Sequence, residues 1–364
     1  MRKGMELPLH WGKAPRWLIQ KMTRLSREIA IIFIEEFGTE EFLRRLSDPF
    51  WFQCFGCVLG FDWHSSGVTS TVLGALKEGL LPEQDNLGFY VCGGKGKSSR
   101  KTPREIEEIS SLSDEKKKEF VQLSRLIAKI DNNTLQDGFS LYHHTFLFDR
   151  KGNWAVIQQG MNPQVRLARR YHWLGEEVVN LVNEPHKAIC CDWRTQPLNL
   201  VAEESEQARL LLPQIAREHP DKVIQQVKKL QTYSLPFRHQ IMLSDIHPDR
   251  MYTILQKVYE AVPPDFLSLI GLEGVGAKTL RALSLIAELI YGSPVSYRDP
   301  ARFSFAHGGK DGHPYPVNRK EYDRTIETLK ILLDKAKLED REKFRALRSL
   351  HHFIQSFSSA DGTF

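Results

Sequence analysis

The amino-acid sequence predicts an α+β domain over residues 1–235, followed by an all-helical domain over residues 236–364. Apolar side chains recur at helical spacing near both ends of the first part, and two β-rich runs flank a polar turn between them. After Pro236 every apolar pattern is helical except for one polar loop. A chain of 364 residues is long enough for two domains, each with its own hydrophobic core.

The composition is that of a folded protein with a small excess of positive charge. The net charge of +5 is compatible with nucleic-acid binding but does not require it. The first residues contain no apolar signal segment, and the longest apolar run, residues 29–34, is too short to cross a bilayer. We therefore expect a cytoplasmic protein with no membrane association.

The five cysteines argue against a disulfide framework because their number is odd. Cys54 and Cys57 form a single C-x-x-C, and no second pair follows at the spacing of a zinc site. Aromatic and aliphatic residues surround both of them. We expect these cysteines to be buried as small hydrophobic side chains.

The first part of the chain alternates helical and extended patterns. A helix is expected over residues 17–46, where apolar residues share one side. Residues 55–80 predict an extended apolar piece, a polar turn and a second helix. Residues 87–94 predict a strand that ends in a glycine loop, and residues 105–130 predict a charged amphipathic helix. Helical spacing returns over residues 213–230.

The stretch SLYHHTFLFDRKGNWAVIQQGM, residues 140–161, predicts a β-hairpin whose turn is residues 149–153. Neighbouring strand residues face opposite sides, so only one of His143 and His144 can join any single site. Each histidine is a candidate catalytic group, and the alternative is that both only satisfy polar groups nearby. The register predicts four cross-strand pairs: Phe148 with Trp154, Phe146 with Val156, His144 with Gln158, and His143 with Gln159.

The stretch LIGLEGVGAKTLRALSLIAEL, residues 269–289, places two glycines around one valine just before a strongly apolar helix. Glycine adopts positive φ angles easily, so the chain can turn tightly and approach a partner closely. The unpaired N–H groups and the positive dipole end of the following helix, beside Lys278, favour phosphate binding. A simple helical corner would need the glycines but not Lys278 and Thr279.

This stretch resembles the helix-hairpin-helix DNA-binding element. The resemblance implies that the hairpin holds the sugar-phosphate backbone without reading bases. The matching residues are Leu272, Gly274, Val275, Gly276, Lys278 and Thr279.

Two further basic segments are candidates for contacts with nucleic acid. Lys95, Lys97 and Arg100 lie in a glycine-rich loop, which is expected either to follow a phosphate backbone or to be a solvated surface loop. Residues 166–173 combine three arginines with aromatic residues, a combination typical of single-strand binding.

The polar loop of residues 303–318 is too long to be without a role in a compact helical domain. Its Lys310 is expected to contact nucleic acid, or the loop closes over the first domain. In one class of DNA glycosylase that shares this hairpin, a catalytic aspartate follows a valine a short distance downstream. The nearest similar position here, Asn318 after Val317, lies too far along the chain and carries an amide that cannot ionise.

Two short segments combine a carboxylate with an imidazole. Asp62 and His64 alternate, so on a strand they share a face beside the hydroxyls that precede the next helix. Glu184 and His186 flank a proline. We expect these four residues to bind a divalent metal, Mn²⁺ or Mg²⁺, with Zn²⁺ as a further candidate. The predicted catalytic residues are Asp62, His64, His143, His144 and Glu184.

Several strings along the whole chain, among them LGFDWHSSGVTSTV, GNWAVIQQGMN and FAHGGKDGHPYPV, resemble a prokaryotic family known only as a domain of unknown function. The resemblance implies the same two-part layout and supplies no reaction. The residues favour a metal-dependent DNA-processing enzyme, a nuclease whose helical domain holds DNA. The alternatives are a DNA-binding protein without catalysis and a nucleotide-handling enzyme that uses residues 65–69.

Overall fold

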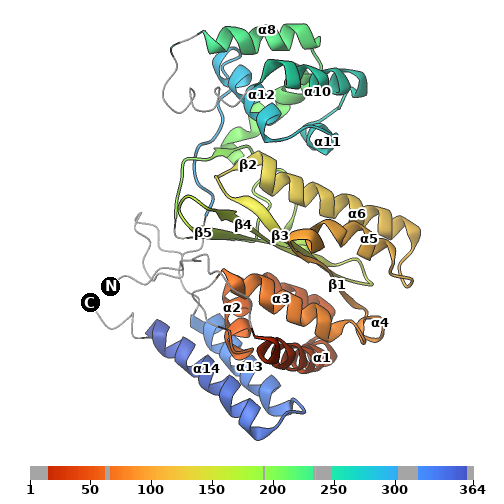
Figure 1. The fold of residues 1–364 in the computed structure, drawn as a ribbon, viewed down its shortest axis with the longest axis vertical. Coiled ribbons are helices and arrows are strands. Elements are labelled where there is room, and N and C mark those ends of the chain that lie inside the picture. The colour runs from red at the N-terminus through yellow and green to blue at the C-terminus, as the bar shows by residue number, and fades with distance from the viewer. Residues whose placement is uncertain are drawn as a thin grey trace.

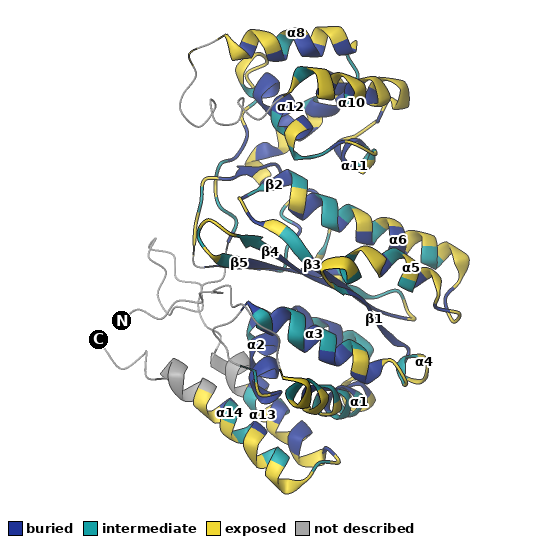
Figure 2. Cartoon of the chain, viewed as in Figure 1, coloured by how far each residue is buried: buried dark blue, intermediate teal, exposed yellow. Residues whose placement is uncertain are grey.

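The computed structural model describes residues 15–61, 66–191, 193–232, 234, 247–301 and 319–358. A five-stranded antiparallel sheet lies across the middle of the molecule, with helices on both faces (Figure 1). Figure 2 shows that its strands are largely buried. The strand order is β1-β3-β4-β5-β6. The strands are β1 (Phe89–Lys95), β3 (Ser140–Asp149), β4 (Trp154–Asn162), β5 (Leu167–Leu174) and β6 (Ala188–Cys190).

The predicted hairpin is confirmed as β3 and β4, and all four predicted cross-strand pairs are present. Asp149 stabilises the turn, because its Oδ1 accepts hydrogen bonds from the backbone N–H groups of Lys151 and Asn153 at 2.9 and 3.0 Å. Side chains alternate along β3, so His143 and His144 face opposite helical layers.

One face of the sheet packs against an N-terminal helical layer. The core of this layer combines helix residues such as Phe33 and Trp51 with sheet residues such as Leu147 and Ile157. The predicted first helix is confirmed, with a kink at Gly38. The helices are α1 (Arg16–Ser47), α2 (Pro49–Val58), α3 (Gly67–Leu80) and the short α4 (Gln84–Leu87).

The expectation of an extended piece from residue 55 is wrong, since α2 continues to Val58. Asp48 starts this helix by accepting a hydrogen bond from the Trp51 N–H at 2.7 Å, and Pro49 occupies its first position. The helix is buried on all sides, so its sequence lacks the polar face that reveals helical periodicity. All five cysteines are free and buried, as predicted.

The opposite face of the sheet packs against α5 (Thr102–Glu107) and α6 (Asp114–Lys129). Phe120 and Ile127 of α6 share a core with Phe146, Phe148 and Trp173 of the sheet. A second, two-stranded sheet pairs β2 with β7 beyond the end of α6. Its strands are β2 (Leu135–Gln136) and β7 (Leu198–Asn199).

The remaining helices divide between the two ends of the molecule (Figure 1). One group adjoins α6 and includes two helices that precede residue 236. The other pair packs on α1 and α2. The first group is α7 (Glu206–Ala216), α8 (Pro220–Gln231), α10 (Pro248–Ala261), α11 (Phe266–Gly271) and α12 (Ala277–Leu289), and the pair is α13 (Arg319–Lys335) and α14 (Asp340–Ser358).

The mixed helical and sheet class is confirmed, with an N-terminal helical region and the sheet in the middle. A single all-helical domain over residues 236–364 is not confirmed, because α13 and α14 bury their apolar side chains against the N-terminal layer. In the described parts of the chain, no helix combines the length and the apolar character that a bilayer span needs.

The packing of α3 on α1 predicts opposite effects for one substitution at two positions. Gly74→Ala meets no atom within 4 Å and should raise the free energy of unfolding by about 0.5–1 kcal/mol, because glycine is unfavourable inside a helix. Gly79→Ala places a methyl group 2.7 Å from the Thr23 carbonyl oxygen and should lower it by about 1–3 kcal/mol. Thermal unfolding followed by circular dichroism measures both variants. Equal changes in the melting temperature of the two variants would contradict the α1–α3 contact.

Candidate nucleic-acid interface and buried polar centres

The glycine hairpin joins α11 to α12. The Asp265 side chain caps α11 by accepting the Ser268 N–H at 2.7 Å. Gly274 has a φ of +89°, a conformation that favours glycine, and it is exposed. Val275 is only 2% exposed, so it anchors the tip of the hairpin in the core.

The start of α12 presents its backbone to the surface. Gly276 precedes the helix in an extended conformation, and no side-chain hydrogen bond caps this end in the described part of the chain. Lys278 is exposed, whereas the Thr279 side chain is buried. The groups available to a ligand are therefore the backbone N–H groups of the first turn and the Lys278 ammonium.

Lys129, at the end of α6, ties this hairpin to the sheet layer. Its ammonium donates to the carbonyl oxygens of Ile270, Gly271 and Leu272 at 3.1, 3.0 and 2.7 Å. These carbonyls would otherwise be unpaired at the C-terminal end of α11. Burial lowers the pKa of Lys129.

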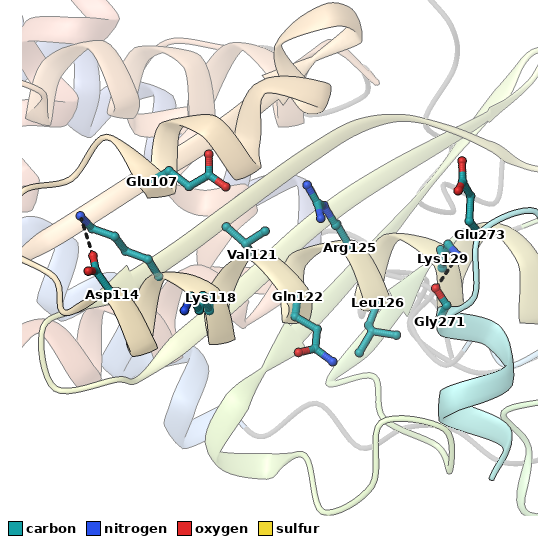
Figure 3. A pocket seen from close by; sticks show the side chains of 11 residues that line it. Glu107, Asp114, Lys118, Val121, Gln122, Arg125, Leu126, Lys129, Gly271 and Glu273 are labelled. Carbon is teal, nitrogen blue, oxygen red and sulfur yellow. Dashed lines mark hydrogen bonds and ion pairs between the residues drawn. The ribbon is translucent and has the colours of Figure 1, made fainter. Parts of the chain in front are cut away.

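A groove of about 980 Å³ runs along α6 and reaches the hairpin at Gly271 and Glu273 (Figure 3). Its basic side chains are Lys117, Lys118, Arg125 and Lys129, and its acidic ones are Glu107, Asp114 and Glu273. Two of the four basic groups are already engaged, since Lys117 lies 3.9 Å from Asp114 and Lys129 binds carbonyls. The groove therefore offers few uncommitted charges to a polyanion.

The basic loop follows the end of β1 and is exposed at Lys95, Lys97 and Arg100. Gly93, just before it, has a φ of +98°, and a Cβ atom there would lie 2.2 Å from the His144 carbonyl oxygen. Only glycine allows this close approach of β1 to β3. The loop is thus a surface element held firmly against the sheet.

The expectation that residues 166–173 form a surface for single strands is wrong. Arg169, Arg170, Tyr171, His172 and Trp173 are all 0% exposed. They lie on β5, an interior strand whose two faces are both covered by other elements.

His144 belongs to a buried chain of hydrogen bonds on the α6 face of the sheet. Its Nδ1 donates to Gln158 Oε1 and its Nε2 accepts from Ser124 Oγ, both at 2.8 Å, a tautomer assigned from these partners. Gln158 then donates to Asp131 Oδ2. The predicted hairpin residue therefore connects, through Gln158, to a carboxylate that the sequence did not indicate.

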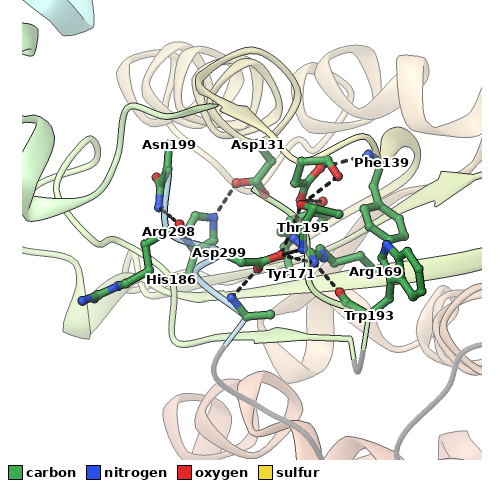
Figure 4. A network of polar contacts seen from close by, with 12 residues as sticks. Asp131, Phe139, Arg169, Tyr171, His186, Trp193, Thr195, Asn199, Arg298 and Asp299 are labelled. Carbon is green, nitrogen blue, oxygen red and sulfur yellow. Dashed lines mark hydrogen bonds and ion pairs between the residues drawn. The ribbon is translucent and has the colours of Figure 1, made fainter. Parts of the chain in front are cut away.

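Asp131 in turn holds His186 (Figure 4). The distance between His186 Nε2 and Asp131 Oδ1 is 2.5 Å, and Trp173 Nε1 donates to the other carboxylate oxygen at 2.9 Å. Because Nε2 is engaged with the carboxylate, His186 Nδ1 is the ring nitrogen left for a ligand. This carboxylate–histidine arrangement is typical of histidines that bind metals.

Glu184 and His186 line a small hollow of about 20 Å³, together with Asn199 and Pro300. This volume accommodates one water molecule or one ion. Glu184 has a φ of +44°, which is unusual for a residue with a side chain, and such local strain is concentrated at functional sites. The predicted pair thus lies together, but no group of three His, Cys, Asp or Glu side chains surrounds a common point in the described residues.

His143 belongs to a separate polar cluster on the face that packs against α2 and α3. Its Nε2 lies 2.8 Å from Thr145 Oγ1, and its Nδ1 has no hydrogen-bond partner although it is buried. Burial lowers the pKa of His143 to about 3. Its cross-strand neighbour Gln159 accepts from Thr69 Oγ1 and donates to Ser66 O and Tyr142 Oη.

Three predicted residues, Asp62, His64 and Lys310, lie outside the described residues, so the structure does not test whether the first two meet Glu184 and His186.

Sequence reasoning missed Asp131 and the buried character of Arg170. A signal existed for Arg170, since arginines between apolar and aromatic residues in a β-rich run predict an interior strand. No comparable signal marks Asp131, which follows α6 in a polar run.

The chain belongs to the DUF763 family, described as a protein of unknown function, whose model matches residues 3–317. This confirms the predicted membership over most of the chain. No curated protein and no solved structure matches the sequence.

The buried His143 predicts a specific pH dependence of stability. Its pKa is about 3 in the folded protein, below the ordinary value of 6.5, so between these pH values the unfolded chain binds a proton that the folded protein excludes. The free energy of unfolding should therefore fall as the pH drops through this window. His143→Gln should reduce that slope by up to about 1.4 kcal/mol per pH unit in urea titrations at pH 4–6, and an unchanged slope would contradict the assignment.

Proposed function

We propose that this protein binds DNA through the hairpin between α11 and α12 without reading its sequence. The observation that carries the proposal is the exposed, uncapped start of α12 beside Gly274 and Lys278. Backbone N–H groups and a helix dipole attract a phosphate, and they contact no base. The buried Val275 and the bonds from Lys129 support the same proposal, because they hold the hairpin rigid before a ligand arrives.

The basic loop supplies a second contact in this proposal. Lys95, Lys97 and Arg100 are exposed and form no ion pair with another described residue. Charges of this kind increase affinity for a polyanion through counterion release, independently of sequence. We place Lys310 among the DNA contacts as well, on the basis of its sequence context alone.

We further propose that the protein is a metal-dependent nuclease in which Glu184 and His186 bind the metal. The observation that favours this activity is the Asp131–His186 pair beside the strained Glu184. The described residues supply only two ligands, so the remaining ones in this proposal are Asp62 and His64. A bound Mn²⁺ or Mg²⁺ would activate water and neutralise charge on the phosphodiester.

DNA binding should weaken steeply as salt concentration rises, and two hairpin substitutions should alter it differently. Gly276 is extended and has room for a Cβ atom, so Gly276→Val should fold normally but block the close approach of phosphate. Lys278→Ala should reduce the slope of log K against log salt by about 1. Lys330→Ala, which removes an exposed charge on α13, is the matched control. Fluorescence anisotropy with duplexes of unrelated sequence measures the affinity of the parent and of the three variants. The proposed interface would be refuted if the affinity did not change with salt concentration, or if Gly276→Val bound as tightly as the parent.

Cleavage of plasmid and of labelled oligonucleotides should require Mn²⁺ or Mg²⁺. His186→Ala and His64→Ala should abolish cleavage while binding persists. Asp131→Asn should lower metal affinity about 10–100-fold, because Asp131 orients His186 and is not a metal ligand in this proposal. The exposed His351→Ala on α14 is the control. If the parent protein binds DNA but cleaves nothing with any of these metals, the DNA-binding protein without catalysis is the correct alternative.

A further inference from the structure

Two adjacent arginines on β5 have opposite electrostatic surroundings. Arg169 and Arg170 both have side chains buried in the protein, but they point to opposite faces of the sheet. Arg169 donates to Asp137 Oδ2 at 2.9 Å and to Asp299 Oδ2 at 2.8 Å (Figure 4). Arg170 contacts no carboxylate among the described residues. One buried charge is therefore balanced and the other is not.

The described partners of Arg170 are neutral. Its Nε donates to His172 Nε2 at 2.9 Å, whereas its terminal nitrogens lie 3.4–3.5 Å from Gln53 Oε1 and 3.5 Å from Thr69 Oγ1. These longer contacts are at the limit of hydrogen bonding. Cys190 is close as well, and burial raises the pKa of its thiol to about 12, so it is uncharged. The guanidinium retains N–H donors that no described group fully uses.

The same cluster contains a buried ring nitrogen without a partner. His143 Nδ1 has no hydrogen-bond partner and its side chain is 1% exposed. In the sheet register Gln159 lies between His143 and Arg170 on neighbouring strands. An incompletely bonded imidazole and an unbalanced guanidinium thus flank one amide. Buried polar groups in this state are uncommon in folded proteins, and a bound ion that supplies the missing partners is one explanation of them.

A polar path connects this cluster with the protein surface. Gln159 donates to the half-buried Tyr142, and the exposed Lys95 ammonium lies 5.7 Å from the centre of the Tyr142 ring. Lys95 is also the cross-strand neighbour of His143. The basic loop therefore lies where this path meets solvent and attracts negatively charged molecules toward it.

We propose that the cluster around Arg170, His143 and Gln159 is a binding site for a phosphate group. A phosphate oxyanion supplies the charge that Arg170 lacks, and guanidinium groups match its geometry with paired hydrogen bonds. Thr69 and Gln53 are the neutral side chains that lie beside the guanidinium. The phosphate is either inorganic phosphate or the terminal phosphate of a DNA strand, and the second source rests on the DNA binding proposed above.

The sign of a stability change tests this site. In phosphate-free buffer, Arg170→Gln removes an unbalanced buried charge, so the variant should melt at a higher temperature than the parent. Arg169→Gln is the matched control on the next residue, and it should lower the melting temperature because Asp137 and Asp299 lose their partner. A second control, Arg169→Lys, keeps the positive charge beside Asp137 and Asp299. Inorganic phosphate should raise the melting temperature of the parent and of Arg169→Lys, but not that of Arg170→Gln.

Calorimetric titration with inorganic phosphate measures affinity directly. Arg170→Gln should weaken binding about tenfold or more, the effect of losing a charge-assisted hydrogen bond. A 5′- or 3′-phosphorylated oligonucleotide that displaces phosphate, when its unphosphorylated counterpart does not, identifies a strand end as the source. If neither oligonucleotide displaces the bound phosphate, the ligand of the site is free inorganic phosphate.

Two results together would refute the site. Phosphate would leave the melting temperature of the parent unchanged, and Arg170→Gln would melt at a lower temperature than the parent. Arg170 would then be purely structural. Gly276→Val separates the two proposals. Loss of duplex binding with retained phosphate binding supports both, whereas loss of phosphate binding in that variant contradicts the Arg170 site.

Discussion

Burial of both faces of the central sheet is the constraint on which the rest of the structure depends. Because helices cover each face, a buried polar side chain in the central part of β3, β4 or β5 has no access to bulk water and needs a partner inside the protein. Asp131 meets this need for Gln158 and Trp173, and Asp137 with Asp299 meets it for Arg169. Arg170 differs from Arg169 in that its charge has no carboxylate partner among the described residues. The buried nitrogens without a hydrogen-bond partner on these strands are His143 Nδ1, Arg169 Nε and His172 Nδ1.

The hairpin and the sheet are connected mechanically by Lys129. One ammonium binds three consecutive carbonyls, so the DNA-binding element that we propose cannot move freely relative to α6. The histidine and carboxylate groups lie on the sheet side of this connection. A ligand held at the hairpin is thus presented to a fixed framework, which is the condition for positioning a strand near a chemical centre.

The sequence was sufficient to predict local structure where strand or helix periodicity is strong. The register from Phe148–Trp154 to His143–Gln159 is confirmed because a single turn and alternating side chains define it. Two local failures share one cause, which is burial on all sides: α2 lacked a polar face, and the arginines of β5 resembled a surface patch. Long-range contacts such as Asp131–His186 could not be predicted, since 55 positions separate the two residues and no local pattern connects them.

Hydrogen–deuterium exchange with and without a short duplex measures the proposed contact itself, because the hairpin would bind phosphate through particular backbone N–H groups. We expect the duplex to slow exchange over residues 272–279, with the amides of Gly274, Gly276 and Lys278 among those protected. α13 and α14, at the opposite end of the molecule, should exchange at the same rate in both samples. Unchanged exchange in the hairpin, with protection only elsewhere on the surface, would contradict the proposed mode of DNA binding.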